Sequence, residues 1–351
     1  MLPRPRRPVG GDTHRVALAH SCSWIPSASS RPKNLAPLRD LVVSGMMWAV
    51  MHDGQVEVPG AALAAAAAAQ FPELAGVDVV PVQSAGTVVA PFRVGAALLA
   101  RVPLVPVRGA SVTDALEAAD QHARALRAHL SLAVPQLFGV GRPFAGYDGV
   151  WSLWTWLDGQ SLDRVLDENP TLCDLDTLAV DLGRVLKAHQ SLPAGGASWS
   201  GNGRGGKPLT DTDWVRTSIQ RCAHLIDPGA ATRVWESALD APAHEGGPVS
   251  INGDPMPGNF IIKKGRLSGM IDISAPVVGD PAADLQPAWV AFDEPQRSAF
   301  KDAMGLDDAA WRRGRGWAFE MAIGGLHYYE HTNPLFFRLA RHTLHRLSET
   351  A

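Results

Sequence analysis

The 351-residue sequence has few cysteines, little charge and no long apolar run. Its three cysteines, Cys22, Cys173 and Cys222, are widely spaced and form no CxxC pair, so neither a disulfide framework nor a zinc site is indicated. A reducing, cytoplasmic setting is therefore expected. No apolar segment approaches the ~20 residues that a membrane span needs, and no long apolar stretch follows the basic start, so neither a membrane anchor nor a secretory signal is expected.

The charge balance argues against two further classes of binding partner. Only 19% of the residues are charged, and the formal net charge is -3. Because there is no overall basic excess, binding to nucleic acid or to an anionic membrane surface is not expected. The length and the 46% hydrophobic content are enough for one large domain or two lobes with a sizeable core.

Residues 1–45 differ in composition from the rest of the chain. They are rich in Arg, Pro and Ser and lack a sustained apolar period, so we expect this segment to be disordered. Met46, Met47 and Met51 follow closely. We favour the interpretation that translation starts at one of these methionines and that the preceding segment is a gene-model extension; a genuine flexible tail is the alternative.

Residues 46–157 are expected to form a small, sheet-based lobe with one helix. From 78 to 102 the pattern is typical of strands, with small-residue turns at "SAGT" and at Gly95-Ala96. Residues 112–130 have the composition of a helix, with Thr113 as its candidate N-cap. An apolar, aromatic strand that ends in a turn is predicted for "VWSLWTWLDG", residues 150–159.

Residues 158–351 are expected to form a second, mainly helical lobe. Apolar residues recur at helical spacing from Leu175 to His189, and "DDAAWRRGRGWAFEMAIGGLHYY" predicts another helix over 307–329, capped by Asp307 or Asp308. Between them, "GNGRGGKP" at 201–208 predicts a loop.

The stretch "VSINGDPMPGNFIIKKGRLSGMIDIS", residues 249–274, gathers polar residues at one end of a predicted hairpin. An apolar strand runs into Asp254, and two further strands pair about a tight turn. Antiparallel pairing puts Met270 opposite Asn259, so that Asp272 arrives beside the loop between Asp254 and Asn259. The three polar residues are therefore expected to be neighbours.

This combination of groups suits phosphoryl transfer. An amide and a carboxylate that converge on one point suit Mg²⁺, which prefers oxygen ligands. A further carboxylate can accept the proton of an incoming hydroxyl while the cation neutralises the phosphates. Each residue alone is more readily explained by a turn cap or a tight loop. The D-x4-N spacing, followed by a hairpin and an Asp thirteen residues after the Asn, is more specific.

The segment "NGDPMPGNFIIKKGRLSGMIDISAPVVGDPAADL" resembles the aminoglycoside and macrolide phosphotransferase family, especially its actinobacterial members. The family pattern is HGD-x4-N, a short hairpin, I-D-F or I-D-W, and GDP-x-x-D-L, and the likeness extends from about Met51 to the C-terminus. The resemblance implies an α+β, bilobal, protein-kinase-like fold with a β-rich N-terminal lobe and a mainly helical C-terminal lobe. It also implies ATP- or GTP-dependent transfer of the γ-phosphate, with Mg²⁺, to a hydroxyl of an aminoglycoside- or macrolide-type antibiotic.

The resemblance implies a role for each matching residue of the C-terminal lobe. Asp254 would be the catalytic base, and Asn259 and Asp272 would hold Mg²⁺. Asp280 and Asp284 would brace the catalytic loop.

In the N-terminal lobe the correspondence is less tight. Arg101 falls where the family carries the strand Lys or Arg that touches the α- and β-phosphates, although a half-exposed strand Arg is the alternative. The turn that covers the phosphates corresponds to Ser84, Gly86 and Thr87, whose N–H groups could meet phosphate oxygens. The hinge, whose backbone would face the adenine edge, corresponds to Trp154, Thr155 and Trp156.

Several positions depart from the family pattern. Asn252 replaces the His before Gly-Asp, but Asn can also donate and accept the hydrogen bonds that brace the loop. Val89 stands where many relatives have Asn, and the acidic helix partner of Arg101 stays open between Glu117 and Asp120. For a cationic antibiotic, an acidic cleft would be expected. Its candidates, which are better explained as ordinary surface carboxylates, are Asp158, Glu320 and Glu330.

Two other functions stay open at this point. One is a metabolic kinase for choline, homoserine or a sugar. The other is a nucleotide-binding pseudokinase with a regulatory role, which the departures from the family pattern motivate. The sequence does not indicate an oligomeric state.

Overall fold

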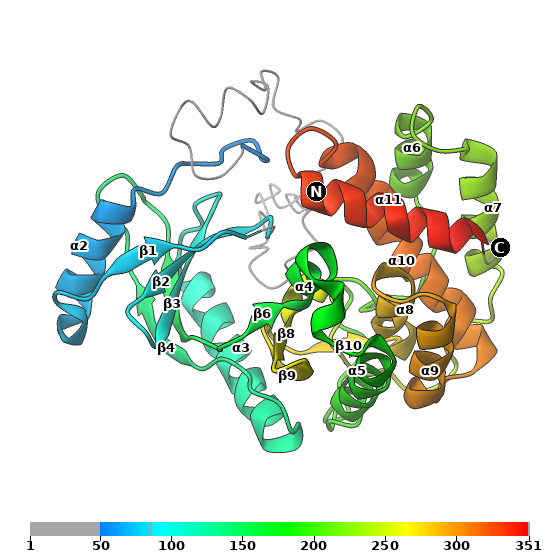
Figure 1. Cartoon of the computed structure of the whole chain (residues 1–351), viewed down its shortest axis with the longest axis horizontal. Coiled ribbons are helices and arrows are strands. Elements are labelled where there is room, and N and C mark those ends of the chain that lie inside the picture. The colour runs from blue at the N-terminus through cyan, green and yellow to red at the C-terminus, as the bar shows by residue number, and fades with distance from the viewer. Residues whose placement is uncertain (1–49, 85, 350–351) are drawn as a thin grey trace, which may run out of the picture.

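The computed structural model describes residues 50–84 and 86–349, and Figure 1 shows a β-rich N-terminal part beside a mainly helical C-terminal part. The disorder expected for residues 1–45, and the candidate starts Met46 and Met47, lie outside the described residues. None of the helices in the described ranges is long and apolar enough to cross a membrane.

The N-terminal part is built on a five-stranded antiparallel sheet in the order β1-β2-β3-β5-β4. Its strands are β1 (Val79–Pro81), β2 (Val89–Val94), β3 (Leu98–Pro103), β4 (Leu137–Gly141) and β5 (Trp151–Thr155). β2 and β3 form the predicted hairpin, and Gly95 supplies the φ of 55° in its turn. The register places Arg101 of β3 between Pro91 of β2 and Ser152 of β5, at the centre of the sheet.

Two helices accompany this sheet, α2 (Gly60–Gln70) and α3 (Ala110–His129). α3 begins at Ala110, directly after Gly109, whose φ of 102° turns the chain into the helix without a side-chain cap. The predicted N-cap at Thr113 is therefore wrong, because Thr113 lies inside the first turns of a helix that starts earlier. Glycine can adopt this backbone conformation at little cost, so no capping side chain is needed to set the start.

The C-terminal part contains two small sheets and a set of helices. A three-stranded sheet has the order β6-β8-β9, and β10 pairs with β7. The strands are β6 (Gln160–Ser161), β7 (Val249–Ile251), β8 (Phe260–Lys263), β9 (Arg266–Met270) and β10 (Val277–Gly279). The helices are α4 (Leu162–Glu168), α5 (Leu175–Gln190), α6 (Asp213–Arg221), α7 (Pro228–Leu239), α8 (Pro287–Val290), α9 (Glu294–Met304), α10 (Asp308–Tyr328) and α11 (Pro334–Glu349). Short 3₁₀ turns are η1 (Pro72–Leu74), η2 (Pro170–Leu172), η3 (Pro257–Asn259) and η4 (Pro281–Leu285).

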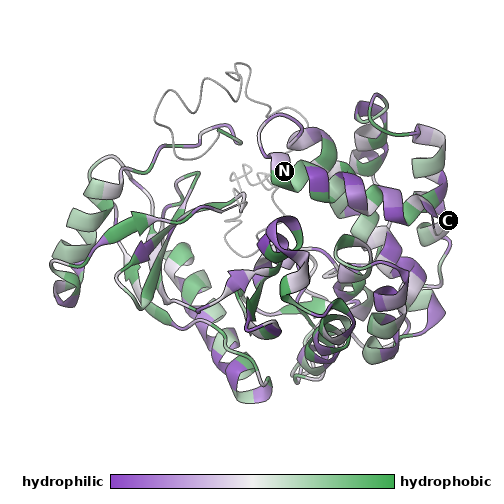
Figure 2. Cartoon of the chain, viewed as in Figure 1, coloured by the Kyte–Doolittle hydropathy of each residue, from purple (hydrophilic) through white to green (hydrophobic). Residues whose placement is uncertain are grey.

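Each part has its own apolar core. The N-terminal core includes Phe92 and Trp151, and the C-terminal core includes Trp235, Trp289 and Trp317. Figure 2 shows hydrophobic positions along the strands of the N-terminal sheet and both hydrophobic and hydrophilic positions along the helices of the C-terminal part. Aromatic side chains are the largest contributors because each buries a large apolar area.

The end of α10 connects the two parts. α10 begins where expected, because the Asp307 carboxylate accepts the Ala310 N–H at 2.7 Å. At its other end, Tyr329 packs into the N-terminal core, and the Tyr328 hydroxyl lies 2.9 Å from Nδ1 of His52. His52, near the start of the described residues, therefore contacts the end of α10 and joins the two parts.

Candidate active site

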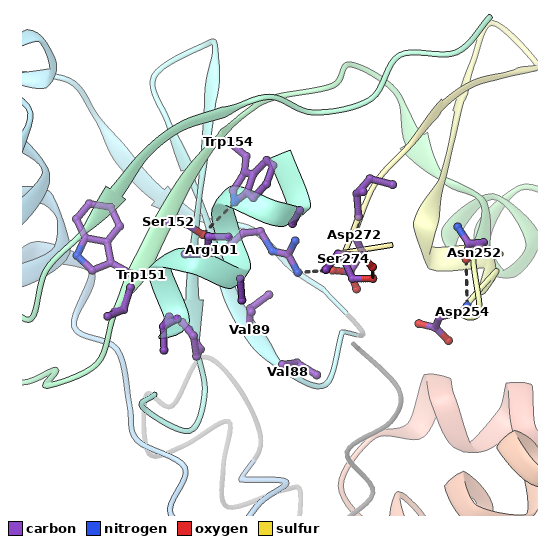
Figure 3. A pocket seen from close by; sticks show the side chains of 18 residues that line it. Val88, Val89, Arg101, Trp151, Ser152, Trp154, Asn252, Asp254, Asp272 and Ser274 are labelled. Carbon is purple, nitrogen blue, oxygen red and sulfur yellow. Dashed lines mark hydrogen bonds and ion pairs between the residues drawn. The ribbon is translucent and has the colours of Figure 1, made fainter. Parts of the chain in front are cut away.

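The loop that carries Asp254 follows strand β7 directly. Gly253 adopts a φ of 74°, which reverses the chain immediately before the aspartate. The Asp254 N–H donates to Oδ1 of Asn252 at 3.1 Å, and the Asp254 carbonyl accepts the Met256 N–H at 2.7 Å. Asn252, in the place of the family histidine, thus ties the loop to itself through its own side chain (Figure 3).

Asn259 closes the same loop. Its Nδ2 donates to the Asp254 carbonyl at 3.0 Å and lies 3.4 Å from Oδ2 of Asp254. The Asn259 carbonyl accepts the N–H of Ile271, the residue before Asp272, at 2.8 Å. The hairpin between them pairs Phe260 with Met270. The structure therefore brings Asp254, Asn259 and Asp272 to one pocket, which Gly86 and Thr87 also line.

Arg101 reaches this pocket from the opposite side of the cleft. Its guanidinium forms an ion pair with the Asp272 carboxylate, and both side chains are only about one-fifth exposed, at 23% and 21% (Figure 3). The ion-pair partner of Arg101 is therefore Asp272 and neither of the acidic candidates on α3. Glu117 is exposed, and Asp120 accepts the Arg124 guanidinium at 2.8 Å and the Leu137 N–H at 3.0 Å.

The turn over the pocket is held from two directions. The Ser84 hydroxyl accepts the Gly86 N–H at 2.9 Å, which folds the turn locally. The Thr87 carbonyl accepts a hydrogen bond from Nε2 of His52, the residue that also meets Tyr328 of α10. Burial lowers the pKa of His52, which favours the neutral ring that can donate from Nε2 and accept at Nδ1. Ser84, unlike Gly86 and Thr87, is not among the residues that line the pocket.

The predicted hinge, residues 154–156, contributes to the cleft mainly through the Trp154 side chain. Trp154 is buried and lines a second pocket, bordered by the sheet and α3, which shares Val88, Val89, Arg101, Asp254 and Asp272 with the first. The N–H groups of Thr155 and Trp156 donate to the carbonyls of Gln136 at 2.9 Å and Ala97 at 2.7 Å. These two donors are used within the N-terminal part, so neither of them faces the cleft as an open donor.

Asp284 accepts hydrogen bonds from the backbone of the loop that carries Asp254. Its carboxylate accepts the N–H groups of Gly253 at 2.9 Å and Asn252 at 3.2 Å, and Nε2 of Gln190 at 3.0 Å. Asp284 is fully buried, and this burial raises its pKa to about 6, against the lowering effect of the three hydrogen bonds. The N–H groups of the two residues before Asp254 therefore both donate to the same carboxylate.

The raised pKa of Asp284 predicts an unusual pH dependence of stability. The folded state holds this proton at pH values where the unfolded chain, with an ordinary value of 3.8, has released it. The stabilisation is therefore complete below the unfolded pKa and is lost as the pH rises to about 6, by ~3 kcal/mol from this residue. Urea unfolding between pH 4 and 7 should show this fall, and in Asp284→Asn, which cannot titrate, the contribution should vanish. An identical pH slope in the two proteins would contradict it.

Asp280 contacts a different neighbour. Its carboxylate accepts Nε of Arg313 at 2.7 Å and Nη2 at 3.2 Å, and also caps η4 through the Ala282 N–H at 3.0 Å. These contacts join η4 to α10. The side-chain hydrogen bonds of Asp280 thus involve Arg313 and Ala282, and any bracing of the Asp254 loop through them is indirect.

Comparison with known proteins decides the family. The sequence model of the phosphotransferase enzyme family (APH) matches residues 97–317, more than half of the chain. The chain belongs to this family. No curated protein is similar enough in sequence to match it significantly.

Solved structures of aminoglycoside and macrolide phosphotransferases share the fold. The GDP complex of wild-type aminoglycoside 2'-phosphotransferase-IIIa has a TM-score of 0.58 at 16% identity, covering 82% of this chain and 98% of that one. The GDP and kanamycin complex of APH(2")-IIia has a TM-score of 0.58 at 17% identity, covering 82% and 98%. Macrolide 2'-phosphotransferase type I has a TM-score of 0.50 at 18% identity, covering 80% and 94%. The predicted α+β kinase-like fold is confirmed, and the chain is a kinase-type phosphotransferase.

One residue that contacts the candidate site has no counterpart in the sequence predictions. Arg204, in the segment predicted only as a loop, places Nη1 3.2 Å from Oδ1 of Asp254. The side chains of Arg204 and Asp254 are 8% and 14% exposed. The loop "GNGRGG" offered a signal, since four glycines around one arginine indicate close backbone packing, but its partner is remote in sequence.

Gly205 fixes the backbone next to Arg204. Its φ is 79°, and a Cβ there would lie 2.4 Å from Cβ of Ala283 and 2.7 Å from Cδ1 of Ile251. We expect Gly205→Ala to lower the free energy of unfolding by about 2–3 kcal/mol, through overpacking and backbone strain. Gly201→Ala is the matched control, because Gly201 has a φ of 73° but nothing within 4 Å of its Cβ position. Equal midpoints of urea unfolding for the two variants would show that packing at Gly205 does not matter.

The three candidate acidic residues do not share one set of neighbours. Asp158 lies 3.5 Å from Nζ of Lys263, and Glu330 lies 2.9 Å from Nε2 of His224. Burial raises the pKa of Glu320 on α10, opposed by the charges of Arg204 and Lys207. Among the three, Glu320 is the residue whose pKa the charge of Arg204 lowers, and Arg204 contacts Asp254.

Proposed function

We propose that this phosphotransferase moves the γ-phosphate of ATP or GTP to a hydroxyl of a small molecule of the aminoglycoside or macrolide antibiotic class. The observation that carries the proposal is the convergence of Asp254, Asn259 and Asp272 in one pocket, with Arg101 opposite them. Solved structures that share the fold, which include complexes with GDP and with kanamycin and a macrolide phosphotransferase, support the nucleotide and the class of acceptor.

Asp254 is the proposed base. A carboxylate accepts the proton of the attacking hydroxyl as its oxygen approaches the γ-phosphate. The bonds from Asn252 to the Asp254 N–H and from Asn259 to the Asp254 carbonyl hold this residue in one orientation. Such fixed orientation contributes to rate because the reacting atoms must lie in line.

Asn259 and Asp272 are the proposed ligands of Mg²⁺. The Asn259 amide nitrogen is committed to the Asp254 carbonyl, so its Oδ1 is the atom left to face a cation. One amide oxygen and one carboxylate fit Mg²⁺, which keeps waters and binds substrate phosphates rather than a closed protein cage. When bound, the metal would neutralise phosphate charge. Within the described ranges there is no group of three or more His, Cys, Asp or Glu that could hold a metal.

Arg101 is the proposed phosphate contact of the sheet. It lies on the strand at the centre of the sheet, and its ion pair with Asp272 aims the guanidinium across the cleft. A guanidinium is permanently charged and presents paired donors that suit phosphate oxygens. Gly86 and Thr87 border the same pocket and would lie over the phosphates.

The contacts of Asn252 favour an active enzyme over a pseudokinase. The substitution of the family histidine motivated the regulatory alternative, yet Asn252 accepts the Asp254 N–H at 3.1 Å. The hydrogen bond that braces the loop is therefore present.

Purified protein, incubated with Mg²⁺ and ATP or GTP, tests the proposal against a panel of aminoglycosides and macrolides, with choline, homoserine and sugars as metabolic acceptors. Mass spectrometry should detect one added phosphoryl group on at least one antibiotic. Transfer to a metabolic acceptor alone would replace the antibiotic assignment. Nucleotide binding without transfer to any hydroxyl compound would overturn the enzymatic function itself.

A further inference from the structure

We propose that Arg204 is a positioning residue for phosphoryl transfer, which acts by holding the Asp254 carboxylate in its productive orientation. This inference rests on the proposed role of Asp254 as the base. Arg204 lies outside the sequence motif that contains Asp254, Asn259 and Asp272, and it reaches the site from the loop of residues 200–206, called the Arg204 loop below.

The Asp254 carboxylate is held at both oxygens. Nη1 of Arg204 lies 3.2 Å from Oδ1, and Nδ2 of Asn259 lies 3.4 Å from Oδ2. Each carboxylate oxygen can accept more than one hydrogen bond, so these contacts fix the plane of the group while it can still accept a hydroxyl proton. Removing Arg204 would take away the contact that restrains Oδ1.

The Arg204 loop is fastened to the strands that carry Asp254. Ser200 donates its N–H to the Val278 carbonyl at 2.9 Å and accepts the Val278 N–H on its hydroxyl at 2.8 Å. The Gly205 carbonyl accepts the Asp280 N–H at 2.9 Å. Val278 belongs to β10, which pairs with β7, the strand that leads into Asp254. The paired strands β7 and β10 therefore position both Arg204 and the Asp254 carboxylate.

The bonding of Arg204 differs from that of a structural arginine in the same protein. Arg313 uses Nε and Nη2 on Asp280 and Nη1 on the Pro242 carbonyl. Nε of Arg204 is buried but has no hydrogen-bond partner among the residues described. Buried donors are nearly always satisfied when stability alone is served. Nε of Arg315 on α10 is likewise buried without a partner among the described residues, so what distinguishes Arg204 is the contact of its Nη1 with the Asp254 carboxylate.

A double-mutant cycle tests whether Arg204 acts through Asp254. Rates are measured for wild type, Arg204→Ala, Asp254→Asn and the double variant, with the acceptor found by the panel or with water, as nucleotide hydrolysis. Arg204→Ala should lower kcat by about 10–100-fold with little change in the KM for nucleotide, as expected for a misplaced reacting group. In the Asp254→Asn background the same change should cost less than about 3-fold, because residues that act as a unit are not additive.

Further variants and measurements make the test specific to Arg204. Arg204→Lys should recover part of the rate, and added guanidinium ion should partly restore Arg204→Ala, since each returns a cation near Oδ1. Arg216→Ala, which removes a half-exposed arginine paired with Asp211, should leave the rate unchanged. Thermal unfolding and nucleotide binding show whether each variant is folded.

The outcomes separate this inference from the proposed function. Full loss in Asp254→Asn with an undiminished rate in Arg204→Ala would overturn the role of Arg204 alone. Additive losses in the double variant would also overturn it, because Arg204 would then act independently of Asp254. An undiminished rate in Asp254→Asn would overturn the proposed function on which the inference rests.

Discussion

Replacing Asp254 with asparagine is expected to lower kcat by about 10²–10⁴-fold, the range that a positioned general base contributes. The amide has nearly the same shape and can keep one contact with Arg204, but it cannot take up the proton of the attacking hydroxyl. The pocket residues Arg101, Asn259 and Asp272 are unchanged by the substitution, so the KM for nucleotide should change little. Steady-state kinetics with the acceptor from the panel measure both quantities.

Asp181→Asn is a suitable control for the loss of one aspartate. Asp181 lies on α5 and accepts the Arg266 guanidinium at 2.6 Å, away from the cleft residues. Its replacement should leave kcat unchanged. If Asp254→Asn retained more than about a tenth of the wild-type rate, proton acceptance by Asp254 would not be the step that this residue serves.

The geometry around Asp254 was largely predictable from the sequence because it depends on local pairing. The turn at Lys264 and Gly265, with φ values of 53° and 76°, fixes where the two strands of the hairpin meet. We predicted Met270 opposite Asn259, and the structure pairs it with Phe260, one residue further along. An error of one residue in register still delivers Asp272 to the correct loop, since the chain continues past the end of the strand.

The partners of the two arginines could not be predicted in the same way. Arg101 pairs with Asp272 across the cleft, 171 residues away, and Arg204 pairs with Asp254, 50 residues away. Nothing in the local pattern of either arginine specifies such a partner, because the packing of whole elements decides it. The predicted N-cap of α3 was wrong for another reason. Gly109 adopts the required backbone angle, so the helix begins without the capping side chain that the prediction assumed.

Replacing Arg313 with methionine is expected to lower the free energy of unfolding by about 3–5 kcal/mol, the usual cost of leaving a buried charge unpaired. Arg313 and Asp280 are 6% and 1% exposed, and their two hydrogen bonds join η4 to α10. The shift of the urea midpoint at unchanged slope measures the effect. Arg338→Met is the control, because its ion pair with Asp167 is half-exposed and should contribute less than about 1 kcal/mol.

The reason for this loss can be separated from the loss of packing. In Asp280→Leu combined with Arg313→Met, no buried charge is left, so much of the stability should return. A double variant as unstable as Arg313→Met would instead assign the loss to packing around α10. The Asp280 N–H also donates to the Gly205 carbonyl, next to Arg204. A stable double variant with a reduced kcat would therefore indicate that the ion pair positions Arg204 more than it stabilises the fold.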